Sequence, residues 1–188
     1  MNEKEAMLQE FPWMVSVDVE TAGSNPSDFA LLSIGACTLL RPRQTFYVEL
    51  APDKECVDAQ AMAVHNLEMD VLKKNGKKPA DALETFSDWL VQAVPEGRKP
   101  LFLGFNAPFD WMFICDYFHH YLGRNPFGHS ALDIKSFLMG FRRVPWSQTS
   151  MKKLTADPLV HNALSDAEVQ ADIFLKILQS GGVLNDNK

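Results

Sequence analysis

The segment Val15-Ser16-Val17-Asp18-Val19-Glu20-Thr21 is rich in β-branched apolar residues and carries two acids two positions apart. Residues 13–19 are apolar enough to form a buried first strand. Successive side chains of a strand point to opposite faces of the sheet, so Asp18 and Glu20 are expected side by side on one face. Taken alone, this pair is also typical of an ordinary solvated strand face.

Two further strands are expected over residues 29–40 and 45–50, and three strands in succession indicate an antiparallel meander. After Pro52 the pattern changes to helices that alternate with short apolar runs. Helices are expected over residues 57–74 with an interruption at 65–66, from Pro79 to Pro95, and over 109–121, and short strands over 100–104 and 131–134. This order of elements predicts an α/β domain with a mixed sheet flanked by helices.

The most regular helical pattern lies near the C-terminus. Apolar side chains recur at three- and four-residue intervals over residues 167–178, with Gln170 on the same stripe, and Gly181-Gly182 is expected to stop the helix. Two residues compete for the N-terminal cap. Ser165 fits the first position of a capping box, and Asn162 is an alternative one turn earlier.

Composition limits the class of protein. The chain has 188 residues, of which 46% are hydrophobic, and a net charge of −6. This length predicts one domain, expected over residues 13–180 between an N-terminal tail (1–12) and a C-terminal tail (181–188). The acidic balance argues against a long footprint on duplex nucleic acid, although an enzyme that holds a few terminal nucleotides needs few phosphate contacts. Three widely spaced cysteines, a polar N-terminus and the lack of a long apolar run indicate a soluble cytoplasmic protein without a membrane partner.

Four carboxylates and one histidine stand out in a fixed order: Asp18, Glu20, Asp110, His161 and Asp166. Acids gathered around one point repel each other unless cations neutralise them, and hard oxygen ligands suit Mg²⁺ or Mn²⁺. Two such ions beside a histidine form a site that can cleave phosphodiesters. An unperturbed imidazole, with a pKa near about 6.5, suits general-base work at neutral pH.

The later members of this set have ordinary explanations when each is taken singly. Asp110 follows the turn Gly104-Phe105-Asn106-Ala107-Pro108-Phe109, where an acid complements a helix N-terminus. In one continuous helix His161 and Asp166 would point about 140° apart, at about 100° per residue. Both can face one site only if His161 lies on the loop that enters the helix and Asp166 in its first turns.

As an ensemble, these segments resemble the DnaQ-like (DEDDh) 3′→5′ exonucleases, a family that includes the proofreading subunit of bacterial DNA polymerase III, ribonuclease T and oligoribonuclease. The matching segments are 17–21, 106–110 and 161–167, and the likeness spans residues 13–178, nearly the whole chain. A middle segment with Ala63-Val64-His65-Asn66-Leu67 is similar to the stretch that lies beside the terminal nucleotide in the family. The chain departs from the family at Phe105 and Asn66, where histidine and glycine are frequent.

The resemblance implies a ribonuclease H-like fold with a five-stranded mixed sheet. It implies that Asp18, Glu20, Asp110 and Asp166 bind two Mg²⁺ (or Mn²⁺) ions and that His161 deprotonates the attacking water. The ions would position the hydroxide and stabilise the leaving 3′-oxygen, so that nucleoside 5′-monophosphates are released from the 3′ ends of single-stranded DNA or RNA.

Four residues near these acids are expected to contact the substrate. They are Thr21, His65, Asn106 and Phe109, and Phe109 is favoured as a stacking residue because it adjoins Asp110. Trp146 is a further candidate for stacking, and Lys152-Lys153 for backbone phosphates. The alternatives that stay open are ribonuclease T-like or oligoribonuclease-like RNA trimming, a small-nucleotide phosphodiesterase and a non-catalytic nucleic-acid-binding module. The sequence does not decide between a polymerase partner, a homodimer or neither.

Overall fold

Strand β1 (Met14–Thr21) is the centre of a five-stranded sheet with the order β3-β2-β1-β4-β5. The computed structural model describes residues 11–155 and 161–180. Strands β2 (Leu31–Thr38) and β3 (Thr45–Glu49) form an antiparallel meander with β1. Strands β4 (Leu101–Gly104) and β5 (Ala131–Asp133) run parallel to β1. The mixed, five-stranded sheet confirms the predicted fold class.

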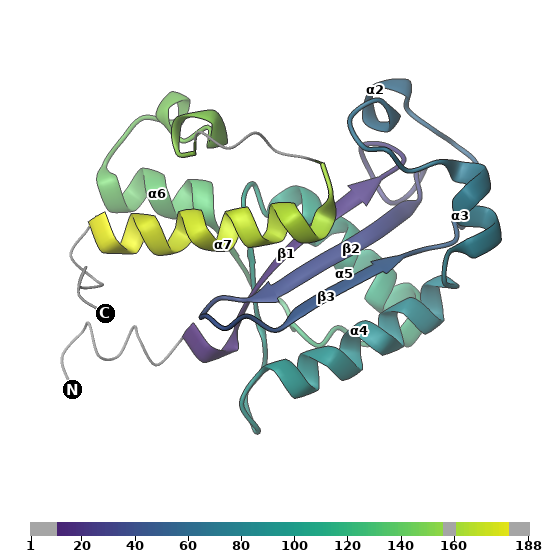
Figure 1. The fold of residues 1–188 in the computed structure, drawn as a ribbon, viewed down its shortest axis with the longest axis horizontal. Helices are drawn as coiled ribbons and strands as arrows, with labels where there is room; N and C mark the ends of the chain where they lie inside the picture. The colour runs from purple at the N-terminus through teal and green to yellow at the C-terminus, as the bar shows by residue number, and fades with distance from the viewer. Residues whose placement is uncertain (1–10, 156–160, 181–188) are drawn as a thin grey trace.

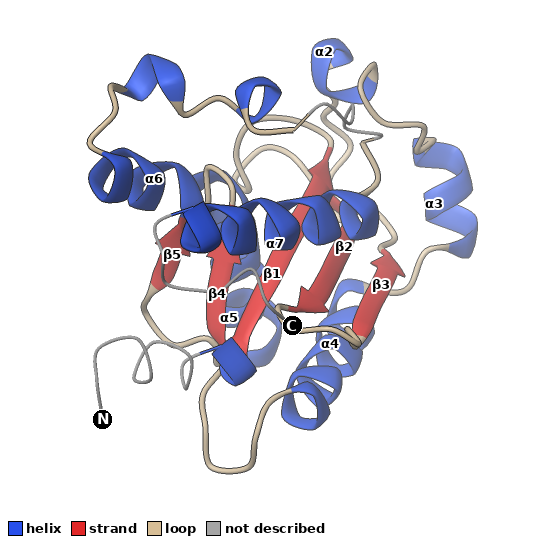
Figure 2. Cartoon of the chain, turned by 60° about the vertical axis from the view of Figure 1, so that its left-hand side comes forward, coloured by secondary structure: helices blue, strands red, loops and turns tan. Residues whose placement is uncertain are grey.

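Helices cover both faces of this sheet (Figures 1 and 2). Helices α4 (Pro79–Ala93) and α5 (Pro108–Leu122) pack on one face, and α6 (Ile134–Arg142) and α7 (Ala163–Ser180) lie on the other. The short helices α2 (Ala59–Met62) and α3 (Met69–Asn75) flank the end at which β1 terminates. Three 3₁₀ turns complete the described chain: Phe11–Trp13, Trp146–Gln148 and Met151–Lys153.

The alternation along β1 divides the interior of the protein into two parts. Val15, Val17 and Val19 belong to the apolar cluster that includes buried side chains of α4 and α5. The side chains between them face α7, where the Ser16 hydroxyl donates a 2.8 Å hydrogen bond to the carbonyl oxygen of Ala167. The strand is therefore buried on both faces: one face is apolar from Val15 to Val19, and the other begins with Met14 in a second apolar cluster and continues with polar side chains.

The helices and strands follow the predicted pattern closely. The helical segment expected over residues 57–74 is split into α2 and α3, and the interruption at 65–66 falls between them. Helix α4 begins at Pro79, whose missing N–H makes it suitable for a first helical position. The predicted stop at Gly181-Gly182 and the greater part of both predicted tails lie outside the described residues.

Within residues 11–155 and 161–180, no helix combines the length and the apolar character that crossing a membrane requires.

Candidate active site

The first two carboxylates lie near the C-terminal end of β1. Asp18 and Glu20 point to the face of the sheet that α7 covers, as their spacing predicts. Glu20 is 8% exposed. The pairing of β1 with β2 shifts register between Glu20 and Thr21, so regular pairing is interrupted beside the acid pair. The strand therefore presents two acids at the point where it leaves the sheet.

The third carboxylate, Asp110, lies in the first turn of α5. The chain reverses at Asn106, whose φ of 66° is left-handed, and α5 begins at Pro108. One oxygen of Asp110 accepts a 3.1 Å hydrogen bond from the backbone N–H of Val19. Asp110 is 5% exposed. This bond holds the start of α5 against β1, between the positions of Asp18 and Glu20.

The last two predicted residues lie at the start of α7. The side chain of Asn162 accepts a 3.2 Å hydrogen bond from the backbone N–H of Ser165, so Asn162, not Ser165, caps the helix. His161 precedes this cap with a φ of 49°, and Asp166 lies in the first turn of the helix. The loop-then-helix arrangement brings both residues to one site, which a continuous helix would not allow.

A glycine makes this position of α7 possible. Gly35 of β2 pairs with Asp18, and a Cβ placed on Gly35 would lie 2.1 Å from backbone atoms of Ala163 and Leu164. The first turn of α7 thus packs directly on the backbone of β2, one strand away from Asp18. Any other side chain at position 35 would push the helix, and Asp166 with it, off the sheet.

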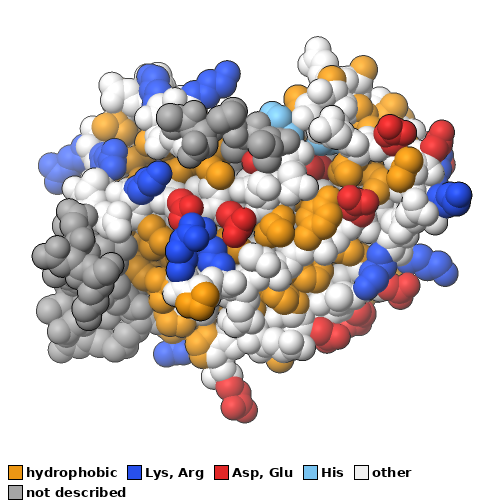
Figure 3. All heavy atoms as spheres, in the orientation of Figure 1, with side chains coloured by type: hydrophobic (Ala, Val, Ile, Leu, Met, Phe, Trp, Pro, Cys, Tyr) orange, Lys and Arg blue, Asp and Glu red, His pale blue; other side chains and the backbone are white. Residues whose placement is uncertain are grey.

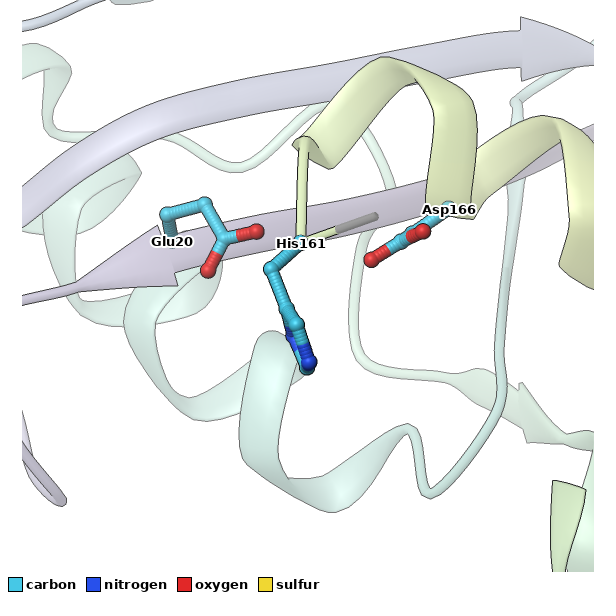
Figure 4. Close-up of side chains that lie close together, drawn as sticks. All are labelled: Glu20, His161 and Asp166. Atoms are coloured by element: carbon cyan, nitrogen blue, oxygen red, sulfur yellow. The ribbon is translucent and has the colours of Figure 1, made fainter. Parts of the chain in front are cut away.

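The structure gathers the predicted residues around one point. One ligand atom from each of Glu20, His161 and Asp166 lies within 4.8 Å of the others. Figure 4 shows the two carboxylates facing each other from β1 and α7, with the histidine between them. Asp18 and Asp110 are outside this group of three, but the charges of Glu20, Asp110 and Asp166 all raise the pKa of Asp18. The four acids therefore form one electrostatic cluster. His161 lies beside this cluster and is exposed to solvent.

The pKa values of the cluster show how unfavourable its negative charge is. Burial is the main cause in each case: it raises the pKa of Glu20 to about 7, with help from Asp166, and that of Asp110 to about 8. For Asp18, burial and the neighbouring carboxylates raise the pKa well above its usual range. Among the described lysines and arginines, none forms an ion pair with these three acids. Hard, buried oxygen donors without a protein cation fit divalent metal ions.

Three of the four predicted substrate contacts line one cavity. Thr21, His65 and Phe109 line a space of about 250 Å³, which Glu20 also borders and to which Val19, Ala61 and Val64 add apolar walls. His65 is buried, and its Nε2 bonds to the carbonyl oxygen of Thr21 at 3.2 Å while its Nδ1 accepts from the N–H of Leu67. Burial lowers the pKa of His65, so it forms this wall as a neutral imidazole.

Asn106, the fourth predicted contact, does not line this cavity. Its side-chain oxygen accepts a 3.2 Å hydrogen bond from Lys135 Nζ, and that ammonium lies 4.2 Å from the centre of the Trp146 ring. Trp146 is 50% exposed. Lys135 was not among the predicted residues, because a single lysine in a helical pattern gives no signal in the sequence.

Sequence reasoning also missed Gln170, which contacts Asp18 directly. The sequence pattern places it on the apolar stripe of the C-terminal helix. The available signal was a polar residue within an otherwise apolar stripe, one helical turn after Asp166.

Fold and site together define a ribonuclease H-like protein with a carboxylate cluster at the end of its central strand. The sequence pattern of the Exonuclease family matches residues 15–174. Over 165 residues the chain is 43% identical to the 3′-5′ DNA exonuclease Cap18 of Escherichia coli, which covers 85% of this chain and 88% of the relative. The chain therefore belongs to the DnaQ-like (DEDDh) exonuclease family and is a 3′→5′ exonuclease; members of this family generally use divalent metal ions.

Solved structures show the same fold. The nuclease domain of 3′hExo, a DEDDh family member bound to rAMP, superposes with a TM-score of 0.75 at 19% identity, covering 95% of this chain and 97% of that one. E. coli Exonuclease I in complex with a dA16 oligonucleotide gives 0.66 at 15% identity, covering 89% of this chain and 40% of that one. At these identities the likeness concerns the fold.

Proposed function

We propose that this protein hydrolyses the 3′-terminal phosphodiester bond of single-stranded DNA, releasing nucleoside 5′-monophosphates with two bound Mg²⁺ or Mn²⁺ ions. The observation that carries the proposal is the convergence of four acids and His161 beside a cavity of nucleotide dimensions. The 43% identity to a DNA exonuclease supports DNA as the polymer.

The carboxylates of Asp18, Glu20, Asp110 and Asp166 are the groups that would hold the metal ions. When bound, such ions supply positive charge for the attacking and leaving oxygens of an in-line displacement. The protein holds these carboxylates in place. The N–H of Val19 bonds to one oxygen of Asp110, and the other oxygen is free of that contact. The cap at Asn162 fixes the start of the helix that carries Asp166.

The terminal nucleoside would occupy the apolar cavity beside Glu20. Phe109 offers a ring for stacking, and Val64 and Ala61 of the α2 region supply apolar walls that make few base-specific contacts. Glu20 also lines a second, more polar cavity of about 260 Å³, together with His161 and Asn162. The scissile phosphate would therefore lie at Glu20, between the two spaces.

His161 is placed to act as general base from the polar side of the site. Its ring is exposed and lines the second cavity, so water reaches it without crossing the nucleoside pocket. The proton of the attacking water would pass to a ring nitrogen of His161 as the new bond to phosphorus forms. The 3′-oxygen of the preceding nucleotide would then leave, and the released nucleotide would keep its 5′-phosphate.

The strand upstream of the scissile bond would cross toward α6. In Figure 3, pale blue histidine side chains lie between a surface with lysines and arginines over α6 and the apolar surface near α2. Lys135, held between Asn106 and Trp146, presents a cation to a backbone phosphate, and the exposed Trp146 offers apolar area to a base. The earlier hypothesis of a phosphate contact at Lys152-Lys153 stays a prediction, although Lys153 Nζ already donates to the carbonyl oxygen of Ser147.

The deciding experiment uses 5′-labelled single-stranded DNA and RNA oligomers of one sequence, each with Mg²⁺, Mn²⁺ or EDTA. We expect a ladder that shortens from the 3′ end of DNA, requires metal and releases nucleoside 5′-monophosphates. Faster degradation of RNA would reassign the substrate to the RNA-trimming alternative. Cleavage of mononucleotide esters without cleavage of either polymer would replace the proposal by a small-nucleotide esterase.

A further inference from the structure

Gln170 is a buried side chain of α7 that bonds on both sides. It is 2% exposed and lies one helical turn after Asp166, on the face of α7 that packs on β1. Its Nε2 donates to Asp18 Oδ1 at 2.5 Å, and its Oε1 accepts from the backbone N–H of Phe105 at 2.8 Å. A backbone N–H can only donate, so the bond from Phe105 fixes the orientation of the amide and turns its N–H donors toward Asp18.

These two bonds join the three segments that carry the acid cluster. Asp18 is on β1, Phe105 begins the turn that leads to Asp110, and Gln170 itself is on the helix that carries Asp166. One amide group therefore relates the positions of three carboxylates that come from distant parts of the chain. The amide is neutral, so it can orient Asp18 without opposing a metal cation, as a lysine at this position would.

We propose that Gln170 is a positioning residue for the metal ions: it holds the carboxylate of Asp18 in the orientation that binds metal, and it fixes the spacing of Asp18, Asp110 and Asp166. The inference rests on the proposed role of these acids as metal ligands. The amide occupies one oxygen of Asp18 and leaves the other oxygen available to a cation. Groups that orient metal ligands in this way typically contribute 10- to 100-fold to metal affinity or activity.

The test replaces the amide with a side chain of similar length that cannot bond. We expect Gln170→Met to weaken Mn²⁺ binding, measured by calorimetry without substrate, by about 10- to 100-fold. The Mn²⁺ concentration for half-maximal exonuclease rate should rise by the same factor, while the KM for DNA at saturating Mn²⁺ stays as in the wild type. Mn²⁺ binding and activation equal to those of the wild type would overturn the proposal.

Ser16→Ala is the matched control. Ser16 lies on the same face of β1, two positions before Asp18, and also makes a buried hydrogen bond to α7. Its loss should lower the melting temperature while leaving the Mn²⁺ affinity unchanged. If Ser16→Ala weakened Mn²⁺ binding as much as Gln170→Met, the effect would belong to the contact between β1 and α7, and the specific role of Gln170 would be refuted.

A second measurement uses the wild-type protein, so it does not depend on whether a variant folds. In the wild type, NMR should show the side-chain amide protons of Gln170 exchanging slowly with water, both without metal and with saturating Mg²⁺. Exchange as fast as that of an exposed glutamine would overturn the proposal. Because binding and exchange are measured without DNA, these results are independent of whether the wild-type protein degrades it.

Discussion

The two faces of β1 use the same backbone for opposite purposes. On one face, Val15, Val17 and Val19 are almost fully buried against the cluster of α4 and α5. On the other face, Asp18 and Glu20 are held together although their own charges oppose it. The first face stabilises the fold by removing apolar area from water, and the second costs stability that metal binding would recover. Substitutions on the two faces should therefore separate stability from activity.

The largest effect should come from Asp18→Asn. The variant loses a proposed metal ligand, so we expect exonuclease turnover to fall to background. It also removes one charge from a repelling cluster, so the metal-free protein should melt at a higher temperature than the wild type. Scanning calorimetry in EDTA and the labelled-oligomer assay measure the two effects on one preparation. A variant that is both active and less stable would contradict the division between the two faces.

His161→Ala should separate catalysis from metal binding on the polar face. Loss of the general base should lower kcat by roughly 10²- to 10⁴-fold at neutral pH. Because the four carboxylates remain, Mn²⁺ should still raise the melting temperature. Turnover and the Mn²⁺-induced thermal shift are measured together. A near-normal kcat would remove His161 from the proposed mechanism.

Gly35→Ala should lower stability and activity together, because this position affects both the packing of α7 and the geometry of the site. The added methyl group would meet the backbone at Ala163 and Leu164, so α7 must shift. We expect a loss of about 1–3 kcal/mol in unfolding free energy from overpacking. Because a displacement of about 1 Å can cost 10²-fold in rate, we also expect activity to fall by about that factor. Denaturant unfolding and initial rates measure the two losses, and an unchanged rate would show that α7 can move without moving Asp166.

The sequence predicted the parts of the fold and site that follow from a regular spacing of side chains along a strand or a helix. The alternation along β1 placed Asp18 and Glu20 on one face, and the helical spacing over residues 167–178 predicted α7. The choice between Asn162 and Ser165 as the capping residue of α7 depends on which side chain accepts a backbone hydrogen bond. The sequence allows both, and the structure shows that Asn162 does. The role of Gln170 could not be predicted, because its two partners are distant in the sequence and become neighbours only in the folded chain.

Val17→Ala should lower stability without changing the chemistry. The side chain is fully buried and lies between Ser16 and Asp18, yet it points to the opposite face. Its truncation should cost about 2 kcal/mol of unfolding free energy. Once rates are corrected for the folded fraction, kcat and the Mn²⁺ requirement should match those of the wild type. Urea unfolding supplies both the free energy and that correction, and a corrected kcat that fell would mean that the two faces are mechanically coupled.

The last prediction concerns the pH dependence of the metal-free protein. The folded chain holds protons on Glu20 to a pKa of about 7 and on Asp110 to about 8, whereas both groups are ionised in the unfolded chain above pH 6.5. The folded state thus binds more protons, and the unfolding free energy should fall as pH rises from 6.5 to 8.5, by about 3 kcal/mol. The lowered pKa of His65 acts in the opposite direction, but mainly below the usual histidine pKa near 6.5, so it offsets little of the fall in this window.

Two variants and added Mg²⁺ test whether the acid cluster causes this dependence of the unfolding free energy on pH. Val17→Ala should shift the whole curve downward with the same slope, because the apolar face carries no titrating group. Asp18→Asn should flatten the slope, because its charge no longer opposes ionisation of the neighbouring acids. Saturating Mg²⁺ should reverse the slope, since the ionised carboxylates are the form that binds the cation. Urea unfolding at a series of pH values measures all three slopes, in EDTA for the two variants and in excess Mg²⁺ without EDTA for the metal-bound protein. A stability that rose with pH in EDTA would show that the folded chain does not hold protons on these carboxyl groups.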